Sequence, residues 1–183
     1  MVGTLGLTFN NFSTRNVFKK GTWTPLPSGD GQRLSLRAQT TGTWYQSYNM
    51  SFTEPWLGGK KPNSLTFSVY HSFFSENGQS KWLKDANNKF IRDDDGNKII
   101  NPTRAAFKSY GSSVGLGTRL KWPDDFFTAY GELGYQYFVL ENSNSQFVFS
   151  DGYANNFYLS TNISRNSIDQ PIYPRSGSQT SLT

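Results

Sequence analysis

The residues that most often do chemistry in proteins are scarce in this chain. It contains no cysteine and a single histidine, His71, among 183 residues. The lack of thiols excludes disulfides, thiolate nucleophiles and thiolate metal sites, and one imidazole excludes sites built from several histidines. His71 lies on the apolar side of an alternating segment, so we expect it to have a structural role or a place at a lipid interface.

Two acidic clusters and a glycine pair are the remaining candidates for a site. The run Asp93–Asn97 predicts a solvated hairpin tip, because a calcium-binding EF-hand loop places its glycine later and ends on a glutamate. Asp124 and Asp125 follow a proline and suit a tight turn. Gly115 and Gly117 stand inside a strand-like segment, where small residues relieve crowding and no phosphate loop is expected. The sequence therefore predicts no catalytic, cofactor-binding or metal-binding residue, no cofactor and no enzyme activity.

Composition indicates one ordered domain, or a piece of one, that is rich in aromatic rings. Aromatic residues make up 16% of the chain although the mean hydropathy is −0.61. Disordered segments are poor in aromatic residues, so these rings indicate an ordered structure. The net charge of +5 is not concentrated in a basic block, and we expect no nucleic-acid partner. No apolar run could form a transmembrane helix and no signal peptide is visible, so the chain is either not exported or an internal piece.

Apolar and polar residues alternate with a period of two through most of the chain, which is typical of strands. Between Thr4 and Phe9, for example, Leu5 and Leu7 share one face with Phe9. The pattern predicts eight strands, at residues 4–9, 33–39, 44–56, 64–73, 110–122, 128–140, 156–164 and 177–183. Several are longer than the five or six residues of an average soluble strand, and match the roughly nine to eleven that a tilted strand needs to cross a bilayer.

The connections between the predicted strands alternate in length. Residues 75–108 and 141–155 are long and polar, whereas residues 55–63 and 123–125 are tight. Outer-membrane barrels have long loops at one end and short turns at the other. The connections therefore favour a transmembrane barrel over a soluble sheet.

The two faces of the predicted strands differ in chemistry. The polar face carries many small residues and suits a hydrated lumen, with its charges at Arg33, Arg37, Arg119, Lys121 and Glu132. Aromatic rings gather where strands meet turns, as in the girdles at membrane surfaces. They are Phe12, Phe18, Trp56, Trp122, Phe126 and Phe127. We therefore expect the apolar face to meet lipid.

Three stretches of the sequence carry a family resemblance. They are Asn10–Ser13, the more specific Ser51–Leu65 (SFTEPWLGGKKPNSL) and Tyr173–Ser178 (YPRSGS). Together they resemble the barrel of the BamA family of outer-membrane protein assembly factors, with strand spacing that agrees along essentially the whole chain. Residues 20–32 are similar to Bacteroidota versions of this family. The fold that the resemblance implies is all-β: an antiparallel up-and-down transmembrane β-barrel, with about eight strands present of about sixteen.

The resemblance also implies a domain boundary and a function. Residues 1–183 would be the N-terminal half of a transmembrane β-barrel domain, from the second strand to the start of the ninth, without the POTRA modules that precede it. Members of the family fold and insert β-barrel proteins in the bacterial outer membrane without nucleotide hydrolysis. The implied partners are outer-membrane lipid, unfolded β-barrel clients, the remaining strands and POTRA modules, and accessory assembly subunits. The seam strands that pair with clients are expected outside this chain.

Two other functions fit the alternation. One is a complete eight-stranded outer-membrane barrel of structural or adhesin type, although such barrels commonly end on an aromatic residue and this chain ends at Thr183. The other is a soluble β-sandwich that binds carbohydrate through exposed rings. A sandwich would bury Val114, Leu133 and Leu159 in a dry interior, whereas a membrane barrel would turn them outward.

Overall fold

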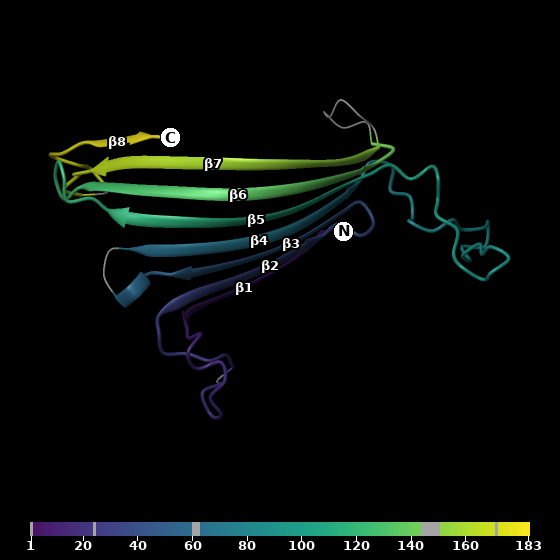
Figure 1. Cartoon of the computed structure of the whole chain (residues 1–183), viewed down its shortest axis with the longest axis horizontal. Coiled ribbons are helices and arrows are strands. Elements are labelled where there is room, and N and C mark those ends of the chain that lie inside the picture. The colour runs from purple at the N-terminus through teal and green to yellow at the C-terminus, as the bar shows by residue number, and fades with distance from the viewer. Residues whose placement is uncertain (1, 24, 60–62, 144–150, 171) are drawn as a thin grey trace.

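The protein is one antiparallel sheet in which every strand lies beside its sequence neighbours (Figure 1). The structure, a computed structural model, describes residues 2–23, 25–59, 63–143, 151–170 and 172–183. The elements are β1 Gly3–Phe12, β2 Gln32–Thr40, β3 Tyr45–Glu54, the short 3-10 turn η1 Leu57–Gly59, β4 Ser64–Ser75, β5 Ala106–Arg119, β6 Phe127–Glu141, β7 Gly152–Asn166 and β8 Gln179–Leu182. In this described part, no helix has the length and hydrophobicity needed to cross a membrane.

All eight predicted strands are present, but their ends differ from the prediction. β1 runs on to Phe12, and β5 begins at Ala106, so the loop expected at residues 75–108 is shorter. β5 also ends earlier than expected, which places Lys121 in the turn after it and not on the polar face of the strand. The differences arise because backbone pairing continues past the apolar residues that reveal a strand in sequence, and stops where the chain must turn.

The sheet curves but does not close (Figure 1). Within the described residues β1 pairs with β2, and β8 pairs only with Ile163–Asn166 of β7. An eight-stranded barrel requires pairing between β1 and β8, which the described residues do not make. The alternative of a complete small barrel is therefore not favoured, whereas the antiparallel up-and-down fold with about eight strands is confirmed.

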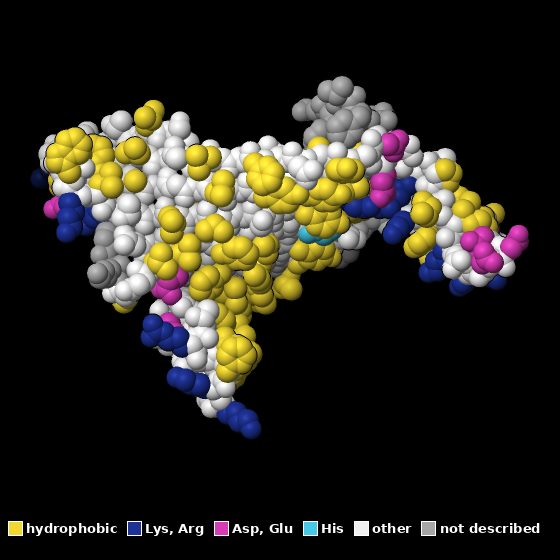
Figure 2. Space-filling model, in the orientation of Figure 1, with side chains coloured by type: hydrophobic (Ala, Val, Ile, Leu, Met, Phe, Trp, Pro, Cys, Tyr) yellow, Lys and Arg dark blue, Asp and Glu magenta, His cyan; other side chains and the backbone are white. Residues whose placement is uncertain are grey.

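The apolar face of the sheet is an outer surface. Val114, Leu133 and Leu159 lie side by side across β5, β6 and β7, and are 45%, 61% and 73% exposed. Among the described hydrophobic residues of the strands only Ala106 and Leu140 are buried. No second sheet packs on the first in the part that is described, so the sandwich alternative is not favoured. Figure 2 shows hydrophobic side chains over the middle of the sheet and charged side chains mainly at its ends and along its loops.

The expected difference between the two ends of the sheet holds for the four connections from β3 to β7 and not for the others; the β7–β8 turn, residues 167–178, is long although it lies at the end with the short turns. The β4–β5 loop and the β6–β7 loop lie at one end, opposite the β3–β4 and β5–β6 turns (Figure 1). The β1–β2 connection, residues 13–31, is long although it lies at the end with the short turns. It is held by its own contacts, including a 2.6 Å hydrogen bond from Ser13 Oγ to Asp30 Oδ2. The β2–β3 turn, residues 41–44, is short although it lies at the long-loop end.

The stretch Ser51–Leu65 forms the end of β3 and a compact turn. Gly58 and Gly59 have φ of 71° and 72°, in the left-handed region that glycine adopts without strain. The N–H of Leu57 donates to the carbonyl of Asn63 at 2.9 Å and closes the turn. Residues 60–62 of this stretch lie outside the described residues. The glycine pair is thus explained by backbone geometry.

The orientation of the sheet can be tested with one substitution on each face. Leu116 is 54% exposed on the outward face, whereas Arg119 lies on the inward face at the end of β5. We expect Leu116→Arg to reduce folding into lipid vesicles, since a cation facing lipid costs up to about 2–4 kcal/mol. Arg119→Ser should fold nearly as well as the parent. Equal folded fractions for both variants, measured by heat-modifiable gel mobility of the full-length protein, would contradict the orientation.

Candidate functional site

An aromatic belt crosses the outward face near the long-loop end. Its neighbouring rings lie 4.4–6.3 Å apart, centroid to centroid, across β3 to β7. The members are Tyr48, His71, Tyr110, Tyr137 and Tyr153. The ring of His71 lies between those of Tyr48 and Tyr110, and its Nδ1 donates to the carbonyl of Ser109 at 3.2 Å. Sequence analysis missed this tyrosine belt because only the strand register brings the rings into one row.

A second aromatic group lies at the short-turn end, where sequence predicted a girdle. Trp56, Trp122 and Phe126 are 51%, 83% and 47% exposed. The guanidinium of Arg165 lies 5.7 Å from the ring of Phe126, and its Nε donates to Asp124 Oδ2 at 2.9 Å. Aromatic rings and arginines with apolar stems favour the interface between hydrocarbon and water.

The spacing of the two aromatic groups suits a membrane. Between Tyr110 and Arg119, β5 advances nine residues, or about 30 Å at 3.4 Å per residue. Tilting by about 35–45° would reduce this to roughly the 25 Å height of the apolar band in outer-membrane barrels. The outward face therefore presents a band of the right height between two interfacial groups.

The inward face carries a network of phenols and one carboxylate. Glu132 accepts hydrogen bonds from the hydroxyls of Tyr130 and Tyr158, each at 2.9 Å. Gln136 Nε2 donates to the hydroxyl of Tyr70 at 2.9 Å. A half-buried carboxylate is tolerated when its oxygens accept hydrogen bonds, so this network stabilises a polar interior. It contains no thiol or imidazole that could act as a nucleophile or base.

Tyrosine rings on the inward face lie directly over glycines of the next strand. A Cβ added at any of three glycines would come 2.1 Å from an atom of the covering tyrosine side chain, a distance that real contacts do not reach. The pairs are Tyr70 with Gly111, Tyr130 with Gly115 and Tyr158 with Gly134. The expected relief of crowding at Gly115 is therefore confirmed, whereas the other two glycines were not found from the sequence. Finding them requires the strand register, which decides which tyrosine ring lies over which glycine.

The predicted lumenal charges are scattered along the inward face. Arg33 and Arg37 alternate with the outward Leu36 on β2 and are exposed. Arg119 donates from Nε to the carbonyl of Asp125 at 2.5 Å. The structure does not bring these cations together into one site.

Near the long-loop end the inward face becomes apolar, which the sequence analysis did not anticipate. The rings of Phe107 and Phe138 stack there, with their centroids 5.7 Å apart.

The two acidic clusters serve turns. The N–H of Asn97 donates to Asp93 Oδ1 at 2.7 Å, and Gly96 has φ of 81°, which makes a hairpin tip. The N–H of Phe126 donates to Asp124 Oδ1 at 2.9 Å, as expected for a turn. In the described part of the chain, no group of three or more His, Cys, Asp or Glu residues could hold a metal ion.

The β7–β8 turn, residues 167–178, is organised around one carboxylate. Asp169 Oδ1 accepts hydrogen bonds from the backbone N–H groups of Gln170, Arg175 and Ser176, at 3.0–3.3 Å. These bonds, first of all that from Ser176, hold the pKa of the Asp169 carboxyl below its usual value. Gly177 closes the turn with φ of 98°, so tight that a Cβ would lie 2.1 Å from the carbonyl oxygen of Ser167.

Two strand edges carry unpaired backbone groups in the described structure. One is the free side of β1, and the other consists of the side of β7 from Gly152 to Asn162, before β8 begins to pair, together with the free side of β8. In hydrocarbon each unsatisfied N–H or C=O costs several kcal/mol. These edges therefore need hydrogen-bonding partners more than any other part of the sheet, and further strands would provide them.

Comparison with known proteins supports the barrel interpretation. The family model described as the Omp85 superfamily domain matches residues 28–183. A solved structure of BamA from Haemophilus ducreyi lacking POTRA domains 1–3 is similar with a TM-score of 0.55 and 19% sequence identity, over 98% of this chain. The chain spans 30% of that structure's length. No match was found among curated protein sequences.

The tyrosine–glycine packing gives a matched pair of variants on β6. Gly134→Ala should push the ring of Tyr158 away from Glu132 and destabilise the barrel by about 1–3 kcal/mol. Gly131→Ala, on the outward face with nothing within 4 Å of the added Cβ, should change stability by less than about 0.5 kcal/mol. The urea midpoint of the full-length barrel measures both, and equal midpoints would contradict the packing.

The β7–β8 turn should depend on pH through Asp169. Because the pKa is lowered in the folded turn, the stabilisation is present above the ordinary aspartate pKa of about 3.9 and is lost as pH falls through the lower, folded value. Acidification should therefore shift the amide NMR signals of Arg175 and Ser176. In Asp169→Asn, which keeps the acceptor oxygen without the charge, the same signals should not titrate; an unchanged titration would assign it to another group.

Proposed function

Because the chain belongs to the Omp85 superfamily, we propose that it forms part of the membrane-embedded barrel of an outer-membrane protein assembly factor that folds and inserts β-barrel proteins. The family places the chain in the bacterial outer membrane. The observation that carries the proposal is the curved sheet itself, which presents an apolar band outward and a hydrogen-bonded polar face inward.

The proposed activity needs strand pairing and no chemical step. An exposed strand edge offers backbone donors and acceptors on which an unfolded client can form its first hairpin. Pairing removes the cost of bringing unsatisfied client backbone into hydrocarbon, and burial of the client's apolar face in lipid drives the rest. Such a factor requires no nucleotide, metal or cofactor and is not an enzyme.

We propose that residues 1–183 are the N-terminal half of the barrel domain. The open edges of β1 and β7 support this, because a sheet in a bilayer must be completed on both sides. The remaining barrel strands would cover these edges, and POTRA modules and accessory subunits would deliver clients. The seam strands that pair with clients lie outside this chain in the proposal, so none of its residues is assigned to client pairing.

Reconstitution of the full-length protein in liposomes tests the function. A urea-unfolded β-barrel client is diluted into these liposomes and its folded fraction is followed over time by heat-modifiable gel mobility. We expect faster folding than in empty liposomes, without added nucleotide, because the edge provides a template.

Liposomes that contain a closed barrel of similar size are the matched control, since any barrel disturbs the bilayer but only an open edge offers a template. Client folding no faster than in this control, or an acceleration that requires ATP, would contradict the proposed function.

A further inference from the structure

A polar pocket lies on the outward face just beyond the tyrosine belt, where β4 and β5 meet the long loop between them. Its volume is about 340 Å³. The side chains that matter for its chemistry are Phe73, Lys81, Arg104, Lys108 and Tyr110, together with His71 of the belt. Phe73 and Lys108 pair across β4 and β5 on the outward face. We call this cavity the arginine pocket.

Arg104 is buried in the arginine pocket with part of its guanidinium unsatisfied. Its side chain is 8% exposed, its Nη1 lies 3.1 Å from Glu141 Oε2, and its guanidinium lies 4.9 Å from the ring centre of Phe73. Its buried Nε has no hydrogen-bond partner in the structure. A buried N–H of a charged group without an acceptor is costly, so the guanidinium contributes positive charge that Glu141 compensates only in part.

The charge of the arginine pocket favours an anion. Three cations line it, Lys81, Arg104 and Lys108, and no acidic residue does. Glu141, beside the pocket, pairs with both Arg104 and Lys108. One carboxylate leaves an excess of two positive charges. Guanidinium and ammonium groups in this arrangement are typical of phosphate recognition.

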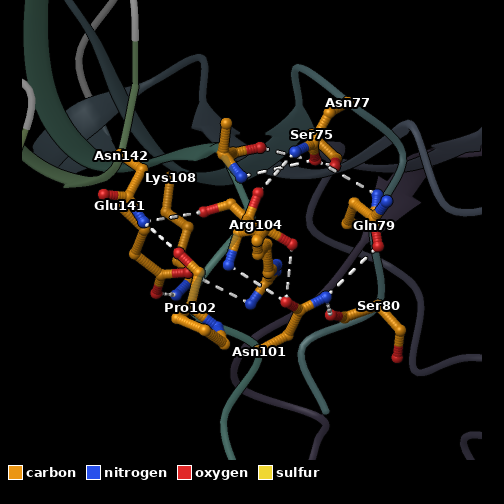
Figure 3. A network of polar contacts seen from close by, with 12 residues as sticks. Ser75, Asn77, Gln79, Ser80, Asn101, Pro102, Arg104, Lys108, Glu141 and Asn142 are labelled. Carbon is orange, nitrogen blue, oxygen red and sulfur yellow. Dashed lines mark hydrogen bonds and ion pairs between the residues drawn. The ribbon is translucent and has the colours of Figure 1, made fainter. Parts of the chain in front are cut away.

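The loop that supplies Arg104 is held in place by side-chain amides, of which Asn101 is buried (Figure 3). Asn101 Nδ2 donates to Gln79 Oε1 at 3.2 Å and to the carbonyl of Ser80 at 3.3 Å. Asn142 Nδ2, from the next loop, donates to the carbonyl of Pro102 at 2.8 Å. These bonds fix the rim before any ligand arrives, which lowers the entropic cost of binding.

An apolar groove adjoins the arginine pocket on the membrane side. It has a volume of about 490 Å³ and is lined by Leu5, Leu36, Met50 and Val69, among others. His71 lines both cavities, so the groove begins where the pocket ends. An anionic site that continues into an apolar groove at membrane height suits an amphiphile with a phosphate at one end and acyl chains at the other, and not a free phosphate ion.

We propose that the arginine pocket binds the phosphorylated headgroup of an outer-leaflet lipid whose acyl chains follow the apolar groove. The ammonium groups of Lys81 and Lys108 donate to phosphate oxygens, and the guanidinium of Arg104 adds its positive charge, while Glu141 holds Arg104 and Lys108 in position. The rings of His71 and Tyr110 face the rest of the headgroup. The long loops lie on the cell-exterior side of outer-membrane barrels, which places this pocket in the outer leaflet.

Native mass spectrometry of the full-length protein tests the proposal. The protein is placed in phosphatidylcholine nanodiscs that contain diphosphorylated lipid A or its dephosphorylated form, and the retained lipid is counted. We expect wild type to retain the phosphorylated form preferentially. Lys81→Ala should weaken this retention about tenfold, since it removes one charge-assisted contact. Lys89→Ala removes the same charge from the same loop outside the pocket and should not change it.

Arg104→Gln should weaken lipid retention more than Lys81→Ala, but Arg104 is buried and this variant could fail to fold. Lys81 is exposed, so Lys81→Ala keeps the test valid in that case. Equal retention in Lys81→Ala and Lys89→Ala, or equal retention of dephosphorylated lipid, would overturn the proposal. Inorganic phosphate that displaces the lipid at matched concentration would assign the pocket to a free anion. Client folding in phosphatidylcholine liposomes should be the same for wild type and Lys81→Ala, which separates this outcome from the proposed function.

Discussion

The pairing of backbone hydrogen bonds in hydrocarbon is the constraint on which the rest of this structure depends. In a bilayer no water satisfies an N–H or C=O group, so the chain must form a sheet whose ladders run without interruption. Once the ladders form, side chains alternate between two solvents, and lipid selects one face while water selects the other. The exposed Leu133 and the hydrogen-bonded Glu132, adjacent in sequence, show this division at its sharpest.

How far the sequence predicts the structure follows from the same constraint. Period-two alternation is local, so all eight strands and the outward direction of Val114 could be predicted. Features that depend on the register between strands could not be predicted. Arg104 lies in the β4–β5 loop and Glu141 at the end of β6, and nothing in the local sequence indicates that they form an ion pair. The packing role of Gly134 could not be predicted either, because it depends on the ring of Tyr158 on the next strand.

The surfaces of the sheet, and not a catalytic centre, account for the functions proposed here. The outward band holds the sheet in lipid, the open edges of β1 and β7 call for further strands, and the arginine pocket faces the headgroups. Each surface presents something that the sheet alone leaves unsatisfied: apolar side chains, backbone N–H and C=O groups, and the excess positive charge of the arginine pocket. The protein is thus best understood through what its sheet leaves unsatisfied.

The most direct test of the central claim uses the absence of cysteine from the chain. Single cysteines at Leu159 and at its neighbour Ser160, in the full-length protein reconstituted in liposomes, are labelled with a polarity-sensitive fluorophore. The probe at residue 159 should be quenched by lipids with brominated acyl chains, and the probe at residue 160 by iodide in the aqueous phase. Quenching of both probes by iodide alone, or a reversal of the two, would contradict the account.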